Sequence, residues 1–146
     1  MDQAIEIARQ AIATGDIPVG AIVVNKNGEI IGQGSNEREA NSDPTAHAEI
    51  VAIRNAAEKL GDWHLTDHTL VVTLEPCAMC AGAIAQSRLQ TVVFGAWDEK
   101  AGAVGSMWDL LRDPRSIFRT EVRAGVLAEE CGELIKSFIQ EVRKKD

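Results

Sequence analysis

The sequence predicts an α/β fold in which a mixed sheet carries helices on both of its faces. Short β-branched runs alternate with segments whose apolar residues recur at helical spacing. The first two runs are joined by Asn27-Gly28, a strong signal for a tight hairpin turn. Strands that alternate with helices after an opening hairpin are typical of a mixed sheet between helical layers. With 146 residues, the chain has the size of one domain, which we expect to span residues 1–146.

The first half of the chain predicts a helix, the hairpin and a second helix. Gly15 is expected to end the first helix, and residues 19–24 and 30–31 supply the hairpin strands. Pro44 suits the first turn of the second helix with Asp43 as its cap, which places His47 in that first turn. The buried face of this helix is expected to consist of Ala46, Ile50, Ile53, Ala57 and Leu60.

The second half continues the alternation. We expect strands at 69–74, 91–95 and 121–123, and helices at 78–87 and 128–143. The complete expected order is α-β-β-α-β-α-β-α-β-α, which includes a helix between the last two strands.

The charge of the chain limits the partners that it can bind. A net charge of −7 and a pI near 5.0 count against a broad, non-specific nucleic-acid binder, although a local basic patch remains compatible with them. Two regions are locally basic, and most such runs are simply solvated faces. They comprise Arg112, Arg115, Arg119 and Arg123, and then Arg143, Lys144 and Lys145.

Membrane and disulfide classes are also disfavoured. The first residues are charged and lack the apolar stretch of a signal peptide, and no run reaches the roughly 18 apolar residues of a membrane span. We therefore expect a cytoplasmic protein with no membrane partner. Three cysteines do not suggest a disulfide framework, and Cys131 lies in an apolar helical stripe, where a small core residue is the favoured interpretation.

Two short segments carry the chemistry: His47-Ala48-Glu49 and Pro76-Cys77-Ala78-Met79-Cys80. A catalytic zinc takes three protein ligands and leaves its fourth position for water, and His47, Cys77 and Cys80 make three. Glu49 then remains as a general acid and base. Positions two apart do not share a helix face, so His47 and Glu49 can converge only ahead of the helix N-terminus, and both cysteines follow a strand-to-helix corner.

Each segment alone is weak evidence. A lone His-x-Glu is most often a partly buried histidine beside a solvated glutamate. A lone Cys-x-x-Cys is redox-active or part of a structural zinc site as often as it is part of a catalytic one. A thioredoxin-like interpretation gives His47 and Glu49 no role. The remaining histidines, His64 and His68, are expected to be loop residues that touch neither metal nor substrate.

The combined segments predict hydrolytic deamination. Zinc can lower the pKa of water from 15.7 to about 7, which makes hydroxide available at neutral pH. The hydroxide attacks the amino-bearing carbon of a base, while Glu49 delivers a proton to the adjacent ring nitrogen and a second one to the departing ammonia. Positioned proton transfer of this kind contributes roughly 10²–10⁴ in rate.

Nearly the whole chain resembles the bacterial tRNA-specific adenosine deaminases of the cytidine deaminase superfamily, whose zinc signature is His-x-Glu with Pro-Cys-x-x-Cys. The segment from Phe94 to Ser106 resembles the tRNA enzymes in particular. The shared residues are Pro18-Val19-Gly20-Ala21, Asn36, Asp43 to Glu49, Thr73 to Cys77, Phe94-Gly95-Ala96, Asp98, Lys100 and Gly102.

The resemblance implies a three-layer α/β/α sandwich around a five-stranded mixed sheet, one zinc per subunit and a homodimer. It also implies conversion of the wobble adenosine of a tRNA anticodon stem-loop to inosine. Asn36 would hydrogen-bond the flipped base, Val19 would form its apolar floor, and the backbone near Ala48 would hold the ring edge. Asp98 and Lys100 would lie where neighbouring nucleotides pass. Without the resemblance, Val19 reads as strand core, Asn36 as a turn cap, and Asp98 with Lys100 as a solvated pair.

The chain departs from the family at Ile117-Phe118, where members often carry Asn-His, and Trp97 has no interpretation from sequence. Two alternatives stay open. One is a deaminase of a free base or nucleoside, of guanine or cytosine type, which would enclose its ligand. The other is a non-catalytic zinc-stabilised RNA-binding module, which would need a fourth ligand from Cys131, His64 or His68.

Overall fold

The computed structural model describes all 146 residues, and its centre is a five-stranded mixed sheet in the order β2-β1-β3-β4-β5. β1 is antiparallel to both β2 and β3, whereas β3, β4 and β5 run parallel to one another. The predicted mixed sheet is therefore confirmed. The strands are β1 (Gly20–Val24), β2 (Ile30–Ser35), β3 (Thr69–Leu74), β4 (Thr91–Ala96) and β5 (Glu121–Arg123).

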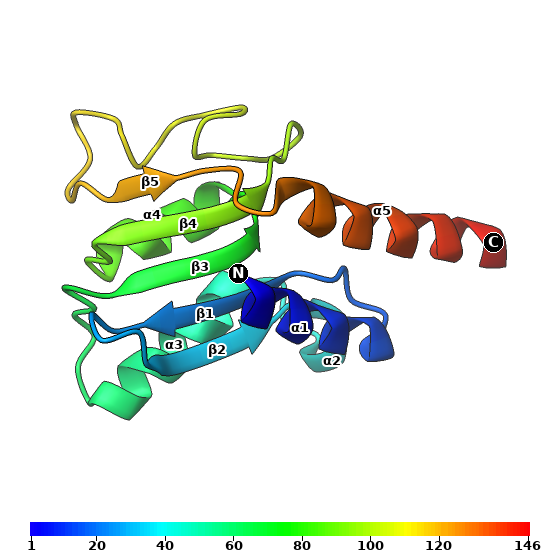
Figure 1. Ribbon diagram of the computed structural model, residues 1–146, viewed down its shortest axis with the longest axis horizontal. Coiled ribbons are helices and arrows are strands. Elements are labelled where there is room, and N and C mark those ends of the chain that lie inside the picture. The colour runs from blue at the N-terminus through cyan, green and yellow to red at the C-terminus, as the bar shows by residue number, and fades with distance from the viewer.

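Helices cover both faces of this sheet, so the three-layer α/β/α arrangement is confirmed. α1 (Asp2–Gln10) and α5 (Ala128–Lys145) lie on one face, and α3 (Ala48–Leu60) and α4 (Ala78–Gln86) lie on the other (Figure 1). α1 continues into the short 3-10 helix η1 (Ala11–Thr14), and the one-turn helix α2 (Arg38–Asn41) precedes α3. None of the helices combines the length and the apolar character needed to cross a membrane.

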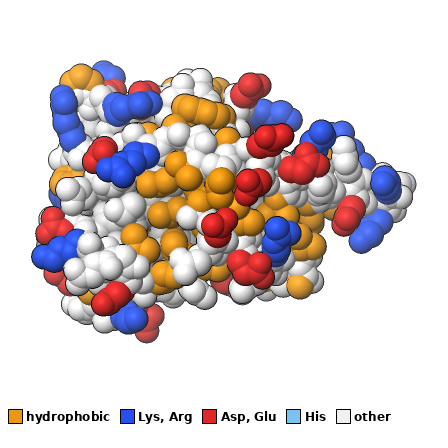
Figure 2. Space-filling view, in the orientation of Figure 1, with side chains coloured by type: hydrophobic (Ala, Val, Ile, Leu, Met, Phe, Trp, Pro, Cys, Tyr) orange, Lys and Arg blue, Asp and Glu red, His pale blue; other side chains and the backbone are white.

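Side chains alternate between the two faces of the central strands, as the two-residue period of a strand requires. Ala21 and Val23 of β1 join the main core with α3 and α4, while Ile22 between them packs with α1. Cys131 is 1% exposed and belongs to a small cluster beneath α5, which confirms its interpretation as a core residue. On the α1 and α5 face, hydrophobic side chains reach the surface between the two helices, and charges of both signs are interspersed around them (Figure 2).

Two predicted turn positions are confirmed by backbone geometry. Gly28 in the hairpin between β1 and β2 has a φ of 81°, and Gly15 at the end of η1 has a φ of 78°. Both angles lie in the left-handed region that glycine adopts without steric cost.

The predicted start of the second helix is wrong. The structure begins α3 at Ala48, with His47 as its extended N-cap residue at φ −68° and ψ 152°. The Asp43 carboxylate instead accepts hydrogen bonds from the Thr45 N–H at 2.8 Å and the Thr45 hydroxyl at 2.7 Å. These bonds stabilise a local turn around Pro44, and such a turn competes with helix initiation.

The predicted buried face of this helix is confirmed only in part. Ile50, Ile53 and Ala57 are half-buried, and Ile53 packs against the main core. Ala46 is buried but precedes the helix, and Leu60 is 42% exposed. The buried residues of α3 are Ala48, Glu49, Ala52 and Ala56. Small residues face the sheet because β2 carries glycines beneath them. A Cβ on Gly34 would lie 2.7 Å from the Ala52 nitrogen and 2.8 Å from the Ala48 oxygen. This close packing fixes the end of α3 that carries His47.

The expected helix between β4 and β5 is absent. Residues 97–120 form an extended loop with two isolated antiparallel bridges, Cys77 to Gly102 and Val104 to Asp109. Some of its backbone N–H groups bond to the Glu75 carboxylate and to the Pro76 carbonyl, and those that bond within the segment form separate turns and bridges, such as Gly105 N–H to the Trp108 carbonyl, and not a continuous helical ladder. Gly105, at φ 134°, further interrupts any helix.

Candidate active site

Three soft donor atoms converge where α3 and α4 begin. The ligand atoms of His47, Cys77 and Cys80 all lie within 4.8 Å of one another. The Nδ1 atom of His47 lies 3.6 Å from the Cys77 sulfur and 3.5 Å from the Cys80 sulfur. A tetrahedral zinc with Zn–S of about 2.3 Å and Zn–N of about 2.0–2.1 Å separates nitrogen and sulfur ligands by roughly 3.5 Å. The donor set therefore fits zinc in both chemistry and spacing, with Nδ1 as the nitrogen.

The two cysteines lie at the corner between β3 and α4, as expected. Cys77 is the N-cap residue of α4 with extended backbone, and Cys80 is buried one turn into the helix. The hydrogen bond from Cys80 lowers the pKa of the Cys77 thiol to about 4, and the contact with His47 acts in the same direction. The same hydrogen bond, together with burial, raises the pKa of Cys80. Without a cation the two thiols therefore share one proton, and a thiolate is already present to bind zinc.

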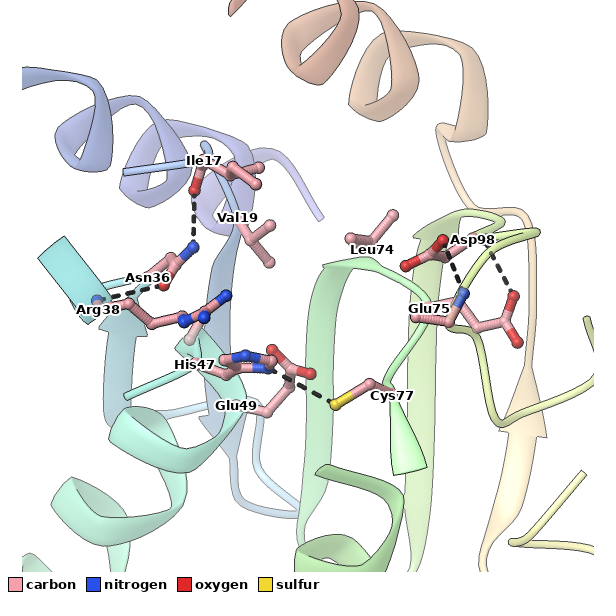
Figure 3. A pocket seen from close by; sticks show the side chains of 12 residues that line it. Ile17, Val19, Asn36, Arg38, His47, Glu49, Leu74, Glu75, Cys77 and Asp98 are labelled. Carbon is pink, nitrogen blue, oxygen red and sulfur yellow. Dashed lines mark hydrogen bonds between the residues drawn. The ribbon is translucent and has the colours of Figure 1, made fainter. Parts of the chain in front are cut away.

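Glu49 lies beside these donors but is not one of them. Its side chain is only 4% exposed, in the first turn of α3, and it lines the same cavity as His47 and Cys77 (Figure 3). Burial raises the pKa of the Glu49 carboxyl above its ordinary value. A buried carboxyl group next to a zinc donor set is available for proton transfer instead of ligation.

The cavity in front of these residues has a volume of about 280 Å³. Ile17, Arg38 and Ala101 are exposed parts of its lining, so the cavity opens to solvent on that side. The complete lining consists of Ile17, Val19, Asn36, Arg38, His47, Ala48, Glu49, Leu74, Glu75, Cys77, Asp98 and Ala101. An open cavity of this size can hold one heterocyclic base, while the sugar and phosphate groups attached to the base lie at the mouth.

Val19, Asn36 and Ala48, three residues expected to contact the base, lie in this lining. Val19 is 7% exposed and belongs to the main core, although it lies directly before β1 and not within it. The Asn36 amide donates to the Ile17 carbonyl at 3.3 Å, and its oxygen accepts from the Arg38 N–H at 3.4 Å. The side chain is thereby oriented, while its second hydrogen and second lone pair stay available to a ligand.

Asp98 and Lys100, which were expected to lie together where neighbouring nucleotides pass, differ in their position relative to the cavity. Asp98 lines the cavity, and its Oδ1 accepts from the N–H groups of Lys100 at 3.1 Å and Ala101 at 3.2 Å. Lys100 is exposed and does not line the cavity, whereas Ala101 does. Asp98 is therefore a turn cap as well as a wall residue.

Sequence reasoning missed five residues of the cavity wall: Ile17, Arg38, Leu74, Glu75 and Ala101. Glu75 is the most strongly constrained of them. Its carboxylate is 2% exposed and accepts from the N–H groups of Asp98 at 3.1 Å, Val104 at 3.0 Å and Ser106 at 3.0 Å, and from the Ser106 hydroxyl. The signal was its position directly before the Pro76-Cys77 corner, but spacing alone could not identify its partners.

The residues expected to lie away from the site do so. His64 and His68 make local contacts in the loop before β3, and His64 stacks on Trp63. Neither histidine nor Cys131 joins the donor group, so no fourth protein ligand completes a closed zinc site. Most of the first basic region is neutralised by ion pairs. These are Arg112 with Asp109, Arg115 with Asp113, and Arg123 with Glu121.

Comparisons with known proteins agree with this geometry. The pattern of the cytidine and deoxycytidylate deaminase zinc-binding region matches residues 1–96. A relative from Haemophilus influenzae named tRNA-specific adenosine deaminase is 49% identical over 145 residues, which cover 99% of this chain and 84% of the relative. A structure solved in a study of A-to-I editing by tRNA:A34 deaminases at the wobble position superposes with a TM-score of 0.88 at 39% identity, covering 92% of this chain and 96% of the other. A guanine deaminase from Nitrosomonas europaea reaches a TM-score of 0.79 at 26% identity, with 94% and 81% covered.

Proposed function

The chain belongs to the zinc-dependent cytidine and deoxycytidylate deaminase family, and we propose that it converts adenosine to inosine at the wobble position of a tRNA anticodon. The observation that carries this proposal is the placement of buried Glu49 beside the three-donor set at the base of an open cavity. The choice of substrate is supported by the 49% identity to a tRNA-specific adenosine deaminase, and by a TM-score of 0.88 to the tRNA:A34 deaminase structure compared with 0.79 to the guanine deaminase from Nitrosomonas europaea.

His47, Cys77 and Cys80 hold the zinc in this proposal. A bound zinc ion supplies a water molecule whose pKa is lowered to about 7. Glu49 takes a proton from the attacking water and delivers it to the ring nitrogen beside the amino-bearing carbon. Glu49 would then take the remaining proton from the hydroxyl group now on that carbon and pass it to the amino group. The C–N bond breaks as the carbonyl forms, so that ammonia departs and inosine remains.

The other wall residues position the base. Val19 forms an apolar floor, Asn36 offers its free amide hydrogen and lone pair to the ring, and the backbone near Ala48 contacts the ring edge. Asp98 and the nearby Lys100 lie where the flanking nucleotides leave the cavity. A splayed anticodon loop supplies a flipped base at lower unstacking cost than a duplex does, so single-stranded loop RNA is the preferred form.

Three further expectations complete the proposal. The partner is a second copy of the chain, forming a homodimer, and the enzyme works in the cytoplasm, where tRNA is processed. Residues 1–146 act as one zinc-dependent deaminase domain.

The open mouth of the cavity separates this proposal from a free-base deaminase, which must enclose its ligand. The test incubates the purified zinc-loaded protein with an anticodon stem-loop RNA that carries adenosine at the wobble position. Mass spectrometry should detect inosine in the loop and no change in an RNA whose only adenosines lie in the stem. Turnover of guanine, cytidine or adenosine as efficient as that of the stem-loop would assign the chain to the small-molecule deaminases instead.

A further inference from the structure

Arg38 is the one lysine or arginine among the residues that line the cavity. It is the first residue of α2, and its side chain extends toward His47 on the same side of the cavity as Asn36 (Figure 3). Of the three carboxylates of the wall, Glu49 and Glu75 are buried, and only Asp98, in the loop after β4, is partly exposed. The mouth therefore has the cation of Arg38 on one side and the carboxylate of Asp98 across from it (Figure 3).

The guanidinium of Arg38 has no carboxylate within ion-pair distance, unlike Arg112, Arg115 and Arg123. The acidic side chain that precedes it in sequence is engaged elsewhere, because the Glu37 carboxylate accepts from the Asn41 amide at 2.9 Å. An exposed arginine without an internal partner keeps all five of its N–H donors for a ligand.

The backbone that carries Arg38 is held in place. Asp16 is 1% exposed, and its carboxylate accepts from the N–H groups of Glu39 at 2.7 Å and Ala40 at 3.1 Å. The Arg38 N–H itself donates to the Asn36 side chain at 3.4 Å. Since α2 is anchored from both sides, the cationic side chain is presented to the cavity from a fixed base.

The size of the cavity indicates what this cation meets. A volume of about 280 Å³ is at the lower end of the range for small-molecule sites, so a base fills it and the sugar and phosphate groups remain at the mouth. The planar guanidinium fork matches phosphate oxygens, and the Asp98 carboxylate repels them from the opposite side. A chain of nucleotides that enters this mouth is therefore directed along Arg38.

We propose that Arg38 binds a backbone phosphate adjacent to the target nucleotide, and that this contact makes the cavity a site for a polynucleotide instead of a free base. The inference rests on the proposed function and deepens it. A free nucleoside cannot make this contact, because it carries no phosphate.

The first test compares Arg38→Ala with wild type on the anticodon stem-loop. We expect kcat/KM to fall about tenfold or more, mainly through KM, because a charge-assisted hydrogen bond is lost. Zinc content should not change. The log–log salt dependence of RNA binding should become shallower by about 0.7, the value for one phosphate contact on a single strand. Arg38→Lys should recover part of the loss, since lysine keeps the charge without the fork.

Lys59→Ala is the matched control, because it removes one positive charge from the C-terminal end of α3. That end is about 16 Å along the helix axis from the end that carries His47. Lys59→Ala should leave the KM for the stem-loop and the salt dependence of RNA binding unchanged. A general charge effect would instead lower RNA affinity equally in Lys59→Ala and Arg38→Ala, and that result would overturn the proposal.

The deciding experiment is a cycle between protein and RNA variants. Two stem-loops carry an uncharged methylphosphonate, one at the linkage before the target adenosine and one at the linkage after it. With the wild-type enzyme, one of these two RNAs should show a kcat/KM lowered about as much as Arg38→Ala lowers it on the unmodified RNA. On that same RNA, Arg38→Ala should lower kcat/KM no further, because the contact is already lost. If the loss from the protein change and the loss from the RNA change multiply at both linkages, Arg38 does not contact either phosphate, while deamination itself stays established. Absence of inosine in the unmodified stem-loop with wild-type enzyme would instead refute the proposed function.

Discussion

Gly102 lies directly against the carboxylate of Glu75, so that a Cβ placed on Gly102 would come within 2.3 Å of the Glu75 side-chain carbon. The contact joins two parts of the site. Gly102 also forms an isolated bridge with Cys77, and the next N–H along the loop, that of Ala103, donates to the Pro76 carbonyl at 2.8 Å. The carboxylate thus holds the loop that follows β4 against the corner that carries the first cysteine.

Gly102→Ala should therefore disturb the wall of the cavity. The added methyl group displaces either the loop or the Glu75 carboxylate, and overpacking of this kind costs about 1–3 kcal/mol. We expect a lower free energy of unfolding in denaturant and a raised KM for the stem-loop. Gly132→Ala in α5 is the control, because its Cβ would lie 3.8 Å from the Cβ of Ala96 in β4, an ordinary van der Waals contact. Equal stability of the Gly102 variant and wild type would mean that the loop moves freely.

Glu49→Gln should retain zinc and lose turnover. The substitution keeps the shape of the side chain but removes the group assigned to proton transfer, which contributes on the order of 10²–10⁴ in rate. Metal analysis and an ammonia-release assay on the same sample separate the two properties. Loss of zinc from this variant would make Glu49 a ligand, and near-normal turnover would remove it from the mechanism.

Cys80→Ala should lose zinc and stability together, because ligand binding contributes to the free energy of folding. The expected result is a metal content near zero and a lower melting temperature that added zinc no longer raises. Cys131→Ala provides the comparison among the three cysteines, since Cys131 is buried away from the donor group. It should lose some packing energy and keep its zinc. Full zinc occupancy in Cys80→Ala would show that the ligand set is wrong.

The sequence predicted correctly those elements whose residue pattern directly reflects their burial in the folded protein. The strand at Thr69–Leu74 has the predicted bounds because a continuous apolar run is buried on both faces of a central strand. The donor residues His47, Cys77 and Cys80 could be chosen as a set because zinc restricts residue type and number. Local signals failed where a competing contact decided the outcome, as at Asp43, whose side chain bonds to Thr45 and not to a helix N-terminus.

The rest of the cavity wall depends on contacts between distant segments. Arg38 carries no motif, and it reaches the cavity because Asp16, more than 20 residues earlier in the chain, anchors α2. The partners of Glu75 lie 23 to 31 residues further along the chain. Spacing within one segment contains no information about such pairs, so these residues could be found only from the folded structure.

Gly34→Ala should loosen the end of α3 that carries the site. Its Cβ would lie 2.7 Å from both the Ala52 nitrogen and the Val51 Cβ, so the helix must move away from β2. We expect a destabilisation of about 1–3 kcal/mol and weaker zinc binding in a competition assay with a chelator. Gly15→Ala would not serve as a control, because Gly15 has a φ of 78°. A variant with wild-type zinc affinity would show that helix packing and the position of His47 are independent.

Asp16 should make stability depend on pH. Burial alone raises the pKa of Asp16, but hydrogen bonds from the Glu39 and Ala40 backbone and from Thr14 outweigh it, and the folded-state pKa lies below the ordinary value of 3.8. A lowered pKa means that the ionised carboxylate stabilises the fold above pH 3.8 and that this contribution is lost as the pH falls through the folded-state pKa. Asp16→Asn should therefore be less stable than wild type by about 2 kcal/mol at pH 7, and the difference should shrink below about pH 4. Urea unfolding at several pH values measures it. Acid also releases zinc, but from both proteins alike, so the difference between them isolates Asp16. A difference that stays constant down to pH 2.5, or that grows on acidification, would show that the charge of Asp16 does not hold α2 in place.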